Sequence, residues 1–173
     1  MANKQALREL QSRLADKLQA ARTHARGRSW LAVECGARGF LFPLGEAGEI
    51  FALAPIVAVP HSHRWFLGVA NLRGHLHGVV DLAAFLGVKQ PDAGRDQSRL
   101  VGFNQSLDLN CVLLVDRLLG LRSEEDLTGE PDTTGSQRPT FAGARYRDRN
   151  GRAWQELNLG ELASNEAFLK IVG

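Results

Sequence analysis

Two apolar runs separated by a short polar corner constrain the fold of this chain most. The first run covers residues 66–70, the corner is Asn71 to Gly74, and the second run follows over 76–82. Asparagine and glycine tolerate the left-handed backbone of a tight turn, so the pattern predicts a β-hairpin. Arg73 stands just before the turn glycine, where we expect its long cationic side chain to be displayed rather than buried.

Most of the remaining chain also has the period-2 pattern of strands. About ten short strands with turns every 8 to 12 residues indicate an all-β fold of two small barrels. Further predicted strands lie in a hairpin over 30–44, in 100–103, in 110–115, and in a closing hairpin from 141 to 159. Residues 46–50 are expected as an exposed link before an apolar stretch that reaches Val59, and 122–139 as the longest segment without structure.

Smaller local signals accompany this pattern. The Asn150-Gly151 pair predicts a type I′ turn, and residues 160–169 predict a short closing helix. Asp81 and Asp116 each follow an apolar strand and precede Leu and Gly, a repeated phrase that suggests two related lobes, with each aspartate capping a helical turn. Cys35 and Cys111 lie in apolar runs, so reduced core thiols are favoured over a disulfide.

The N-terminal segment differs from the rest in period and in charge. Residues 3–24 predict a helix with one narrow apolar stripe formed by Leu7, Leu10, Leu14, Leu18 and Ala21. Two interpretations stay open: the helix packs on its own domain, or it docks on a partner or a second copy. Residues 1–29 contain seven Lys or Arg and two acidic residues, which leaves 14 basic and 17 acidic residues elsewhere.

Composition excludes several protein classes. At 173 residues and 44% hydrophobic, the chain fits one domain or two small lobes that share a core. It has no apolar run of about 18 residues and a polar start, so we expect a cytoplasmic protein without direct membrane insertion. The slightly acidic body, without aromatic residues interleaved with Lys or Arg, argues against nucleic-acid binding.

The residues around the central hairpin resemble the signature of the CheW family of chemotaxis adaptors. The resemblance rests on Asn71-Leu72-Arg73-Gly74, then Val79-Val80-Asp81-Leu82, with Glu49-Ile50 placed 22 positions before Asn71. It implies two intertwined five-stranded SH3-like barrels with an N-terminal helix and a short C-terminal helix. It divides the chain into a basic amphipathic helix, 1–29, and a CheW-like domain, 30–173. The leading cationic helix and the closing segment look most like the PilI branch of type IV pilus systems.

The resemblance also implies a function without catalysis. CheW-like adaptors bridge the cytoplasmic tip of a methyl-accepting chemoreceptor and the regulatory domain of a CheA-type histidine kinase, and the PilI branch would control twitching motility. No cofactor or metal is implied. The glutamate and arginine of the signature would flank a groove between the lobes. The residues expected at the protein-binding surface are Glu49, Ile50, Gly68, Asn71, Arg73 and Gly74.

A metal-dependent enzyme is the rival interpretation. Two pairs, His61 with His63 and His75 with His77, each place two imidazoles on one side of an extended chain, and Asp81 shares the face of the second pair. We favour histidines at loops and rims without a metal, because spacing fixes no third ligand.

Overall fold

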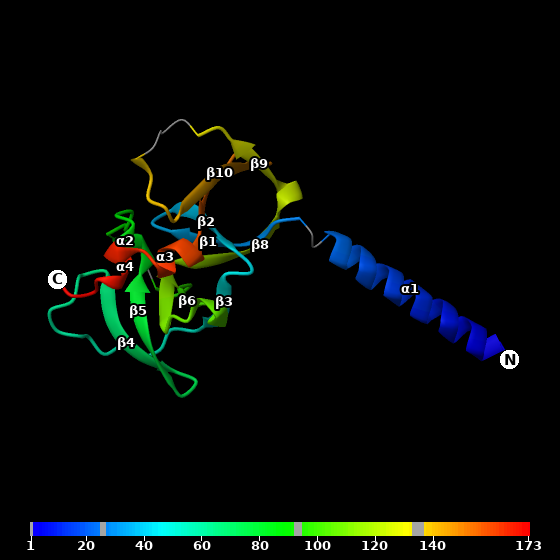
Figure 1. Cartoon of the computed structure of the whole chain (residues 1–173), viewed down its shortest axis with the longest axis horizontal. Helices are drawn as coiled ribbons and strands as arrows, with labels where there is room; N and C mark the ends of the chain where they lie inside the picture. The colour runs from blue at the N-terminus through cyan, green and yellow to red at the C-terminus, as the bar shows by residue number, and fades with distance from the viewer. Residues whose placement is uncertain (1, 25–26, 92–94, 133–136) are drawn as a thin grey trace.

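The computed structural model describes residues 2–24, 27–91, 95–132 and 137–173, and it shows a mostly β protein with a helix at one end (Figure 1). The α-helices are α1 (Ala2–His24), α2 (Leu82–Phe85), α3 (Leu159–Ala163) and α4 (Glu166–Leu169). Two 3-10 turns are η1 (Gln105–Leu107) and η2 (Glu124–Asp126). The strands are β1 (Ser29–Cys35), β2 (Arg38–Pro43), β3 (Ala47–Phe51), β4 (Phe66–Leu72), β5 (His75–Asp81), β6 (Arg99–Phe103), β7 (Cys111–Val115), β8 (Arg117–Ser123), β9 (Leu127–Glu130), β10 (Ala142–Asp148) and β11 (Ala153–Leu157).

These strands form two sheets, each of which we call a lobe. The six-stranded lobe has the order β8-β1-β2-β11-β10-β9, and the five-stranded lobe has the order β3-β6-β7-β5-β4. The chain enters the six-stranded lobe with β1 and β2, builds the whole five-stranded lobe, and then returns. Neighbouring strands run antiparallel except for two parallel pairs, β11 with β2 and β5 with β7. The all-β fold with two lobes is therefore confirmed, with six and five strands instead of five and five.

Three apolar clusters explain why the strands are so rich in buried residues. One cluster fills each lobe, and the third lies between the two sheets, where α2, α3 and α4 add Leu82, Leu159, Leu162 and Phe168. Strand β1 contributes to two of them, because Trp30 and Ala32 face the six-stranded lobe while Leu31 and Val33 face the shared core. A strand between two apolar layers is buried on both faces, as β1 and β7 are.

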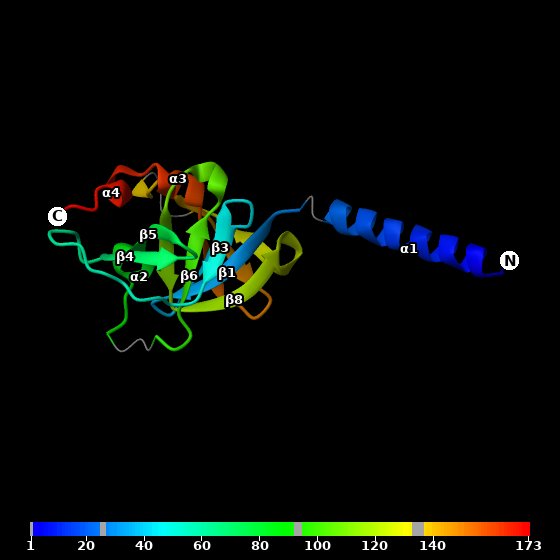
Figure 2. The ribbon, with the colours of Figure 1, turned by 90° about the horizontal axis from the view of Figure 1, so that it is seen from below.

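Helix α1 stands away from both lobes in each of two perpendicular views (Figures 1 and 2). All side chains from 3 to 18 are exposed, and Leu7, Leu10, Leu14 and Leu18 are 54% to 64% accessible to solvent. The interpretation in which this helix packs on its own domain is wrong for these side chains, because nothing in the described parts of the lobes covers them. The side chain of Ala21, the last member of the predicted stripe, lies outside the described residues. None of the described helices is long and apolar enough to cross a membrane.

Two segments predicted without structure contain strands. Residues 46–50 are not a link: β3 pairs with β6, where Ile50 lies opposite Val101. In contrast, the apolar stretch after β3 is largely irregular, with one bridge between Val57 and Val69. In 122–139, β8 continues to Ser123 and β9 pairs with β10, which supplies the sixth strand. Residues 133–136 of that segment lie outside the described residues.

The two aspartates of the repeated phrase have different roles. Asp81 caps α2, because its Oδ1 accepts a hydrogen bond from the backbone N–H of Ala84 at 3.2 Å. Asp116 caps no helix, since β8 begins at the next residue; its Oδ2 accepts from the backbone N–H of Gly36 at 2.7 Å. The strands that precede these aspartates, β5 and β7, are parallel neighbours in the five-stranded lobe. The phrase therefore does not mark one copy in each lobe, as the sequence suggested.

Three other local predictions can be compared with the structure. The turn after β10 is not type I′, because Gly151 has a φ of 82° while Asn150 is not among the residues with positive φ. The predicted closing helix is two short helices, α3 and α4. Cys35 and Cys111 are free and buried, and burial raises the pKa of both thiols, that of Cys111 to about 12.

Candidate functional site

A tight turn between β4 and β5 positions the arginine of the signature. Leu72 pairs with His75, so Arg73 and Gly74 alone form the loop, with φ of 51° and 82°. Two consecutive left-handed residues define a type I′ hairpin, whose twist matches that of the flanking strands. Asn71 fixes the turn by accepting a hydrogen bond at its Oδ1 from the backbone N–H of Gly74 at 2.9 Å. Arg73 is thus held on a rigid element while its side chain remains 71% exposed.

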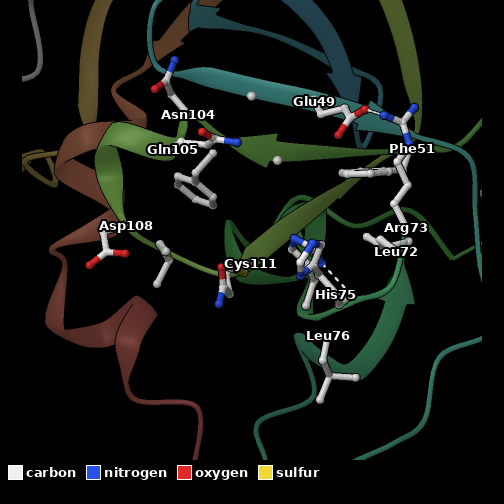
Figure 3. A pocket seen from close by; sticks show the side chains of 16 residues that line it. Glu49, Phe51, Leu72, Arg73, His75, Leu76, Asn104, Gln105, Asp108 and Cys111 are labelled. Atoms are coloured by element: carbon white, nitrogen blue, oxygen red, sulfur yellow. Dashed lines mark hydrogen bonds and ion pairs between the residues drawn. The ribbon is translucent and has the colours of Figure 1, made fainter.

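Strand β3 holds the guanidinium of Arg73 from two directions (Figure 3). Nη1 of Arg73 forms an ion pair with Oε1 of Glu49, whose side chain is 46% exposed. The guanidinium carbon also lies 5.7 Å from the centre of the Phe51 ring, a cation–π contact. Glu49 and Phe51 are two residues apart and share one face of β3. The two contacts restrict a long side chain that would otherwise sample many rotamers.

This arginine borders an open pocket of about 790 Å³. Residues from β3, the β4–β5 turn, the end of β6 and the loop before β7 line the pocket, and all of these belong to the five-stranded lobe. The pocket that Glu49 and Arg73 line therefore lies within one lobe, whereas the resemblance implied a groove between the lobes. The physical reason is the pairing of β3 with β6, which places the glutamate in the same sheet as the arginine.

The opposite wall of the pocket is a polar loop from Asn104 to Asn110 (Figure 3). Asn104 begins η1 by accepting a hydrogen bond from the backbone N–H of Ser106 at 3.0 Å, and Asp108 ends it with a left-handed φ of 49°. Gln105 and Asp108 line the pocket together with Asn104. Sequence analysis missed this wall, although a polar run between two buried strands was its available signal.

Phe51 is a further pocket residue that sequence analysis missed. It lies two positions after Glu49, so the period of a strand places it beside the glutamate. Assigning residues 46–50 to an exposed link hid this relationship. His75 and His77 also line the pocket, with the ring of His77 5.9 Å from that of Phe51.

Four of the six predicted site residues lie outside the pocket lining: Asn71 and Gly74, which shape the turn, and Ile50 and Gly68. Ile50 is on the opposite face of β3 from Glu49 and is 40% exposed. Gly68 is at the other end of β4 from the turn, with a φ of 135°. A Cβ at this position would overlap the carbonyl oxygen of Val57, which bridges to Val69. Gly68 thus allows a close approach of two backbones and shapes the lobe rather than the pocket.

The histidine pairs do not form a metal site. Among the described residues, which include all four histidines of the two pairs, no group of three or more His, Cys, Asp and Glu side chains could hold a metal ion. His63 instead stacks on Trp65, with ring centres 5.3 Å apart. The Oδ2 of Asp81 lies 2.7 Å from Nζ of Lys89, and this carboxylate is buried. The metal-enzyme interpretation thus has no support in the geometry.

The chemistry of the pocket suits recognition better than reaction. It presents a fixed cation, two carboxylates, amide side chains and imidazoles around an open cavity. Cys111 is its only lining thiol among the described residues, and burial raises the pKa of that thiol to about 12. Since the thiolate is the nucleophilic form, Cys111 is not activated at neutral pH. Fixed polar groups around a cavity match a partner with complementary hydrogen-bonding groups.

Comparison with known sequences and structures gives consistent results. A sequence model of the family described as CheW-like domain matches residues 29–167. The protein PilI of Pseudomonas aeruginosa is 29% identical over 162 residues, which covers 92% of this chain and 88% of that protein. The chemotaxis protein CheW of Rhizobium meliloti is 29% identical over 126 residues, 67% of this chain and 75% of that protein. The crystal structure of the scaffolding protein TtCheW from Thermoanaerobacter tengcongensis has a TM-score of 0.60 at 16% identity and covers 76% of this chain and 88% of that one.

Proposed function

The chain belongs to the CheW-like domain family of non-enzymatic adaptors, and from this membership we propose that it couples a methyl-accepting chemoreceptor to a CheA-type histidine kinase. The adaptor would bind the signalling tip of the receptor and the regulatory domain of the kinase at the same time. Its similarity to PilI over 92% of the chain supports type IV pilus twitching motility as the output of the pathway.

One observation carries the assignment of a binding surface: Arg73 is exposed yet held by a type I′ turn, by Glu49 and by Phe51. An exposed ion pair contributes at most about 1 kcal/mol to folding, so stability alone explains little of this arrangement. A preorganised arginine loses less conformational entropy on binding and is enriched among residues that dominate interfaces. We therefore assign Arg73 and the adjoining pocket to contact with one of the two partners.

The remaining predicted site residues support this surface in different ways. Glu49 orients the guanidinium, while Asn71 and Gly74 shape the turn that displays it. Ile50 adds exposed apolar area on the other face of β3, and Gly68 holds β4 against residue 57. The proposed interface thus centres on Arg73, with Gly68 acting through the shape of the lobe.

Calorimetric titration with the isolated kinase regulatory domain, and separately with the receptor tip, tests this proposal. We expect Arg73→Glu to weaken binding of one partner at least about tenfold, because reversal places a like charge against groups that complement the arginine. The free energy of unfolding should change by about 1 kcal/mol or less. Arg64→Glu is the matched control, since Arg64 is also exposed and lies outside the pocket lining. A folded Arg73→Glu protein that binds both partners normally would remove the pocket from the interface.

A charge swap separates direct contact from orientation. The double variant Glu49→Arg with Arg73→Glu keeps an opposite-charge pair at the same position. If Arg73 contacts the partner, the swap should bind as weakly as Arg73→Glu. Recovery to wild-type affinity would show that the pair acts only by fixing β3 against the turn.

A further inference from the structure

Helix α1 presents an apolar stripe that nothing in the described structure covers. At 100° per residue, the four leucines Leu7, Leu10, Leu14 and Leu18 fall within a sector of roughly 80°. Helices that cover a globular core have an apolar face wider than about 100°, whereas the contact between two paired helices is narrower. The width of this stripe therefore fits one partner helix better than a broad surface.

The charges of α1 are sorted around this stripe. On the same helical projection, Arg13 and Lys17 border one side of the stripe, and Lys4 and Arg8 follow on the other side. The two acidic residues, Glu9 and Asp16, are seven positions apart and lie on the opposite face. All of these side chains are exposed. A partner would thus meet leucines flanked by cations on both sides.

Helix α1 lacks two sources of stability, a complemented N-terminal dipole and a packed apolar face. Its first turn contains no acidic residue to interact with the helix dipole, and Lys4 is placed there instead. Most helical stability in proteins comes from packing an apolar face, and this face is unpacked. Contact with a partner would supply the missing packing.

We propose that α1 is a docking arm for an amphipathic helix of another protein, one whose apolar stripe is flanked by Asp and Glu. Carboxylates at these flanking positions would pair with the cations beside the leucines, as charges beside a coiled-coil seam do. A second copy of this chain is disfavoured, because it would bring the same cations face to face. A membrane surface is disfavoured because α1 has no Trp or Phe to insert. This contact is separate from the pocket at Arg73 and goes beyond the proposed function.

The test uses the full chain and a synthetic helical peptide as the probe. The peptide has leucines at the spacing of α1 with glutamates on both sides, and a second peptide has lysines at those flanking positions. By fluorescence anisotropy at low salt, we expect the glutamate peptide to bind at least about tenfold tighter than the lysine peptide. Leu10→Ser with Leu14→Ser should abolish the binding, and Arg13→Glu with Lys17→Glu should remove most of the preference for the glutamate peptide, because one flank of the stripe is then acidic and the other still basic.

The far face of the helix supplies the matched control. Glu9→Lys with Asp16→Lys changes the net charge by the same magnitude as the reversal of Arg13 and Lys17, in the opposite direction, and should alter the affinity less than about twofold at a salt concentration that screens charges on the far face. Circular dichroism of each full-length variant checks the helical content. Arg73→Glu should bind the peptide normally, so that failure of this inference is distinct from failure of the pocket.

Three outcomes would overturn the proposal. Equal affinity for the two peptides would show that flanking charge does not select the partner. Binding to vesicles of phosphatidylserine and phosphatidylcholine, without binding to the glutamate peptide, would identify a membrane surface instead. Self-association in sedimentation experiments that the leucine variant removes would identify a second copy as the occupant.

Discussion

The two lobes differ in where they use polar side chains. In the six-stranded lobe carboxylates accept hydrogen bonds from buried tryptophans: the indole N–H of Trp30 donates to Oε2 of buried Glu156 at 2.5 Å, and that of Trp154 donates to Oδ2 of half-buried Asp148 at 3.0 Å. In the five-stranded lobe the buried carboxylate of Asp81 caps α2, and other polar groups gather around the pocket beside Arg73. The comparison teaches that one sheet can place carboxylates against its buried tryptophans while the other gathers polar groups around an open pocket.

The first prediction tests whether the hydrogen-bonded tryptophans of the six-stranded lobe serve stability. Trp30→Ala should lower the free energy of unfolding by about 4 kcal/mol, because it opens a cavity and leaves the carboxylate of Glu156 without its donor. Urea unfolding followed by circular dichroism measures this change. Leu121→Ala is the control, with an expected change below about 0.5 kcal/mol, since Leu121 is 62% exposed. A loss below 1 kcal/mol for Trp30→Ala would contradict the comparison.

The second prediction asks how much the five-stranded lobe depends on backbone geometry. Gly68→Ala should cost about 3 kcal/mol, because its φ is 135° and the new Cβ would overlap the carbonyl of Val57. Thermal and urea unfolding measure the loss. Gly129→Ala in β9 is the matched control and should cost far less, since its φ is not positive and open space surrounds its position. Equal stability of the two variants would show that β4 can move away from residue 57.

The third and smallest effect concerns charge at the surface of the six-stranded lobe. A hydrogen bond from Arg152 lowers the pKa of Glu34, and the charge of Arg117 acts in the same direction. A carboxyl with a lowered folded pKa stabilises the protein above its unfolded pKa of about 4.3, and this stabilisation disappears as the pH falls through the folded pKa. Glu34→Gln should therefore lower stability at pH 7 by about 1 kcal/mol or less.

The pH profile of unfolding checks this third prediction. The difference between wild type and Glu34→Gln should shrink as the pH falls below the unfolded pKa of about 4.3 and vanish once the pH is below the lowered folded pKa, where the glutamate is protonated in both states. A difference that stays constant as the pH falls through this range would show that the amide lowers stability by disturbing packing. The ion pairs of Glu34 would then make no measurable contribution to the free energy of unfolding.

Sequence reasoning succeeded where local chemistry decides the structure. The corner at residues 71–74 contains the residues that a two-residue turn needs, and the turn occurs there. Asp81 was predicted as a helix cap for the same reason, since its carboxylate acts three residues away. The resemblance added the fold as a whole, which short-range patterns specify only as two small barrels.

The failures arise where a distant partner decides the structure. Strand β3 contains Gly48 and Glu49, so it resembles a link until it pairs with β6 about 50 residues later. Asp116 resembles a cap, yet its acceptor role depends on Gly36 from the start of the domain. The leucine stripe of α1 looks the same whether it faces its own domain or another protein. Predicting that the pocket lies in one lobe would also have required knowledge of the pairing between β3 and β6.

The parallel pairing of β11 with β2 has a consequence for how the chain is made. Both strands belong to the six-stranded lobe, but the whole five-stranded lobe is synthesised between them. A ribosome that has released residues up to Val115 has therefore supplied every strand of the five-stranded lobe. Strand β2 at that point still lacks its neighbour β11. The six-stranded lobe cannot close until Leu157 has emerged, so the order of translation favours completing the five-stranded lobe first.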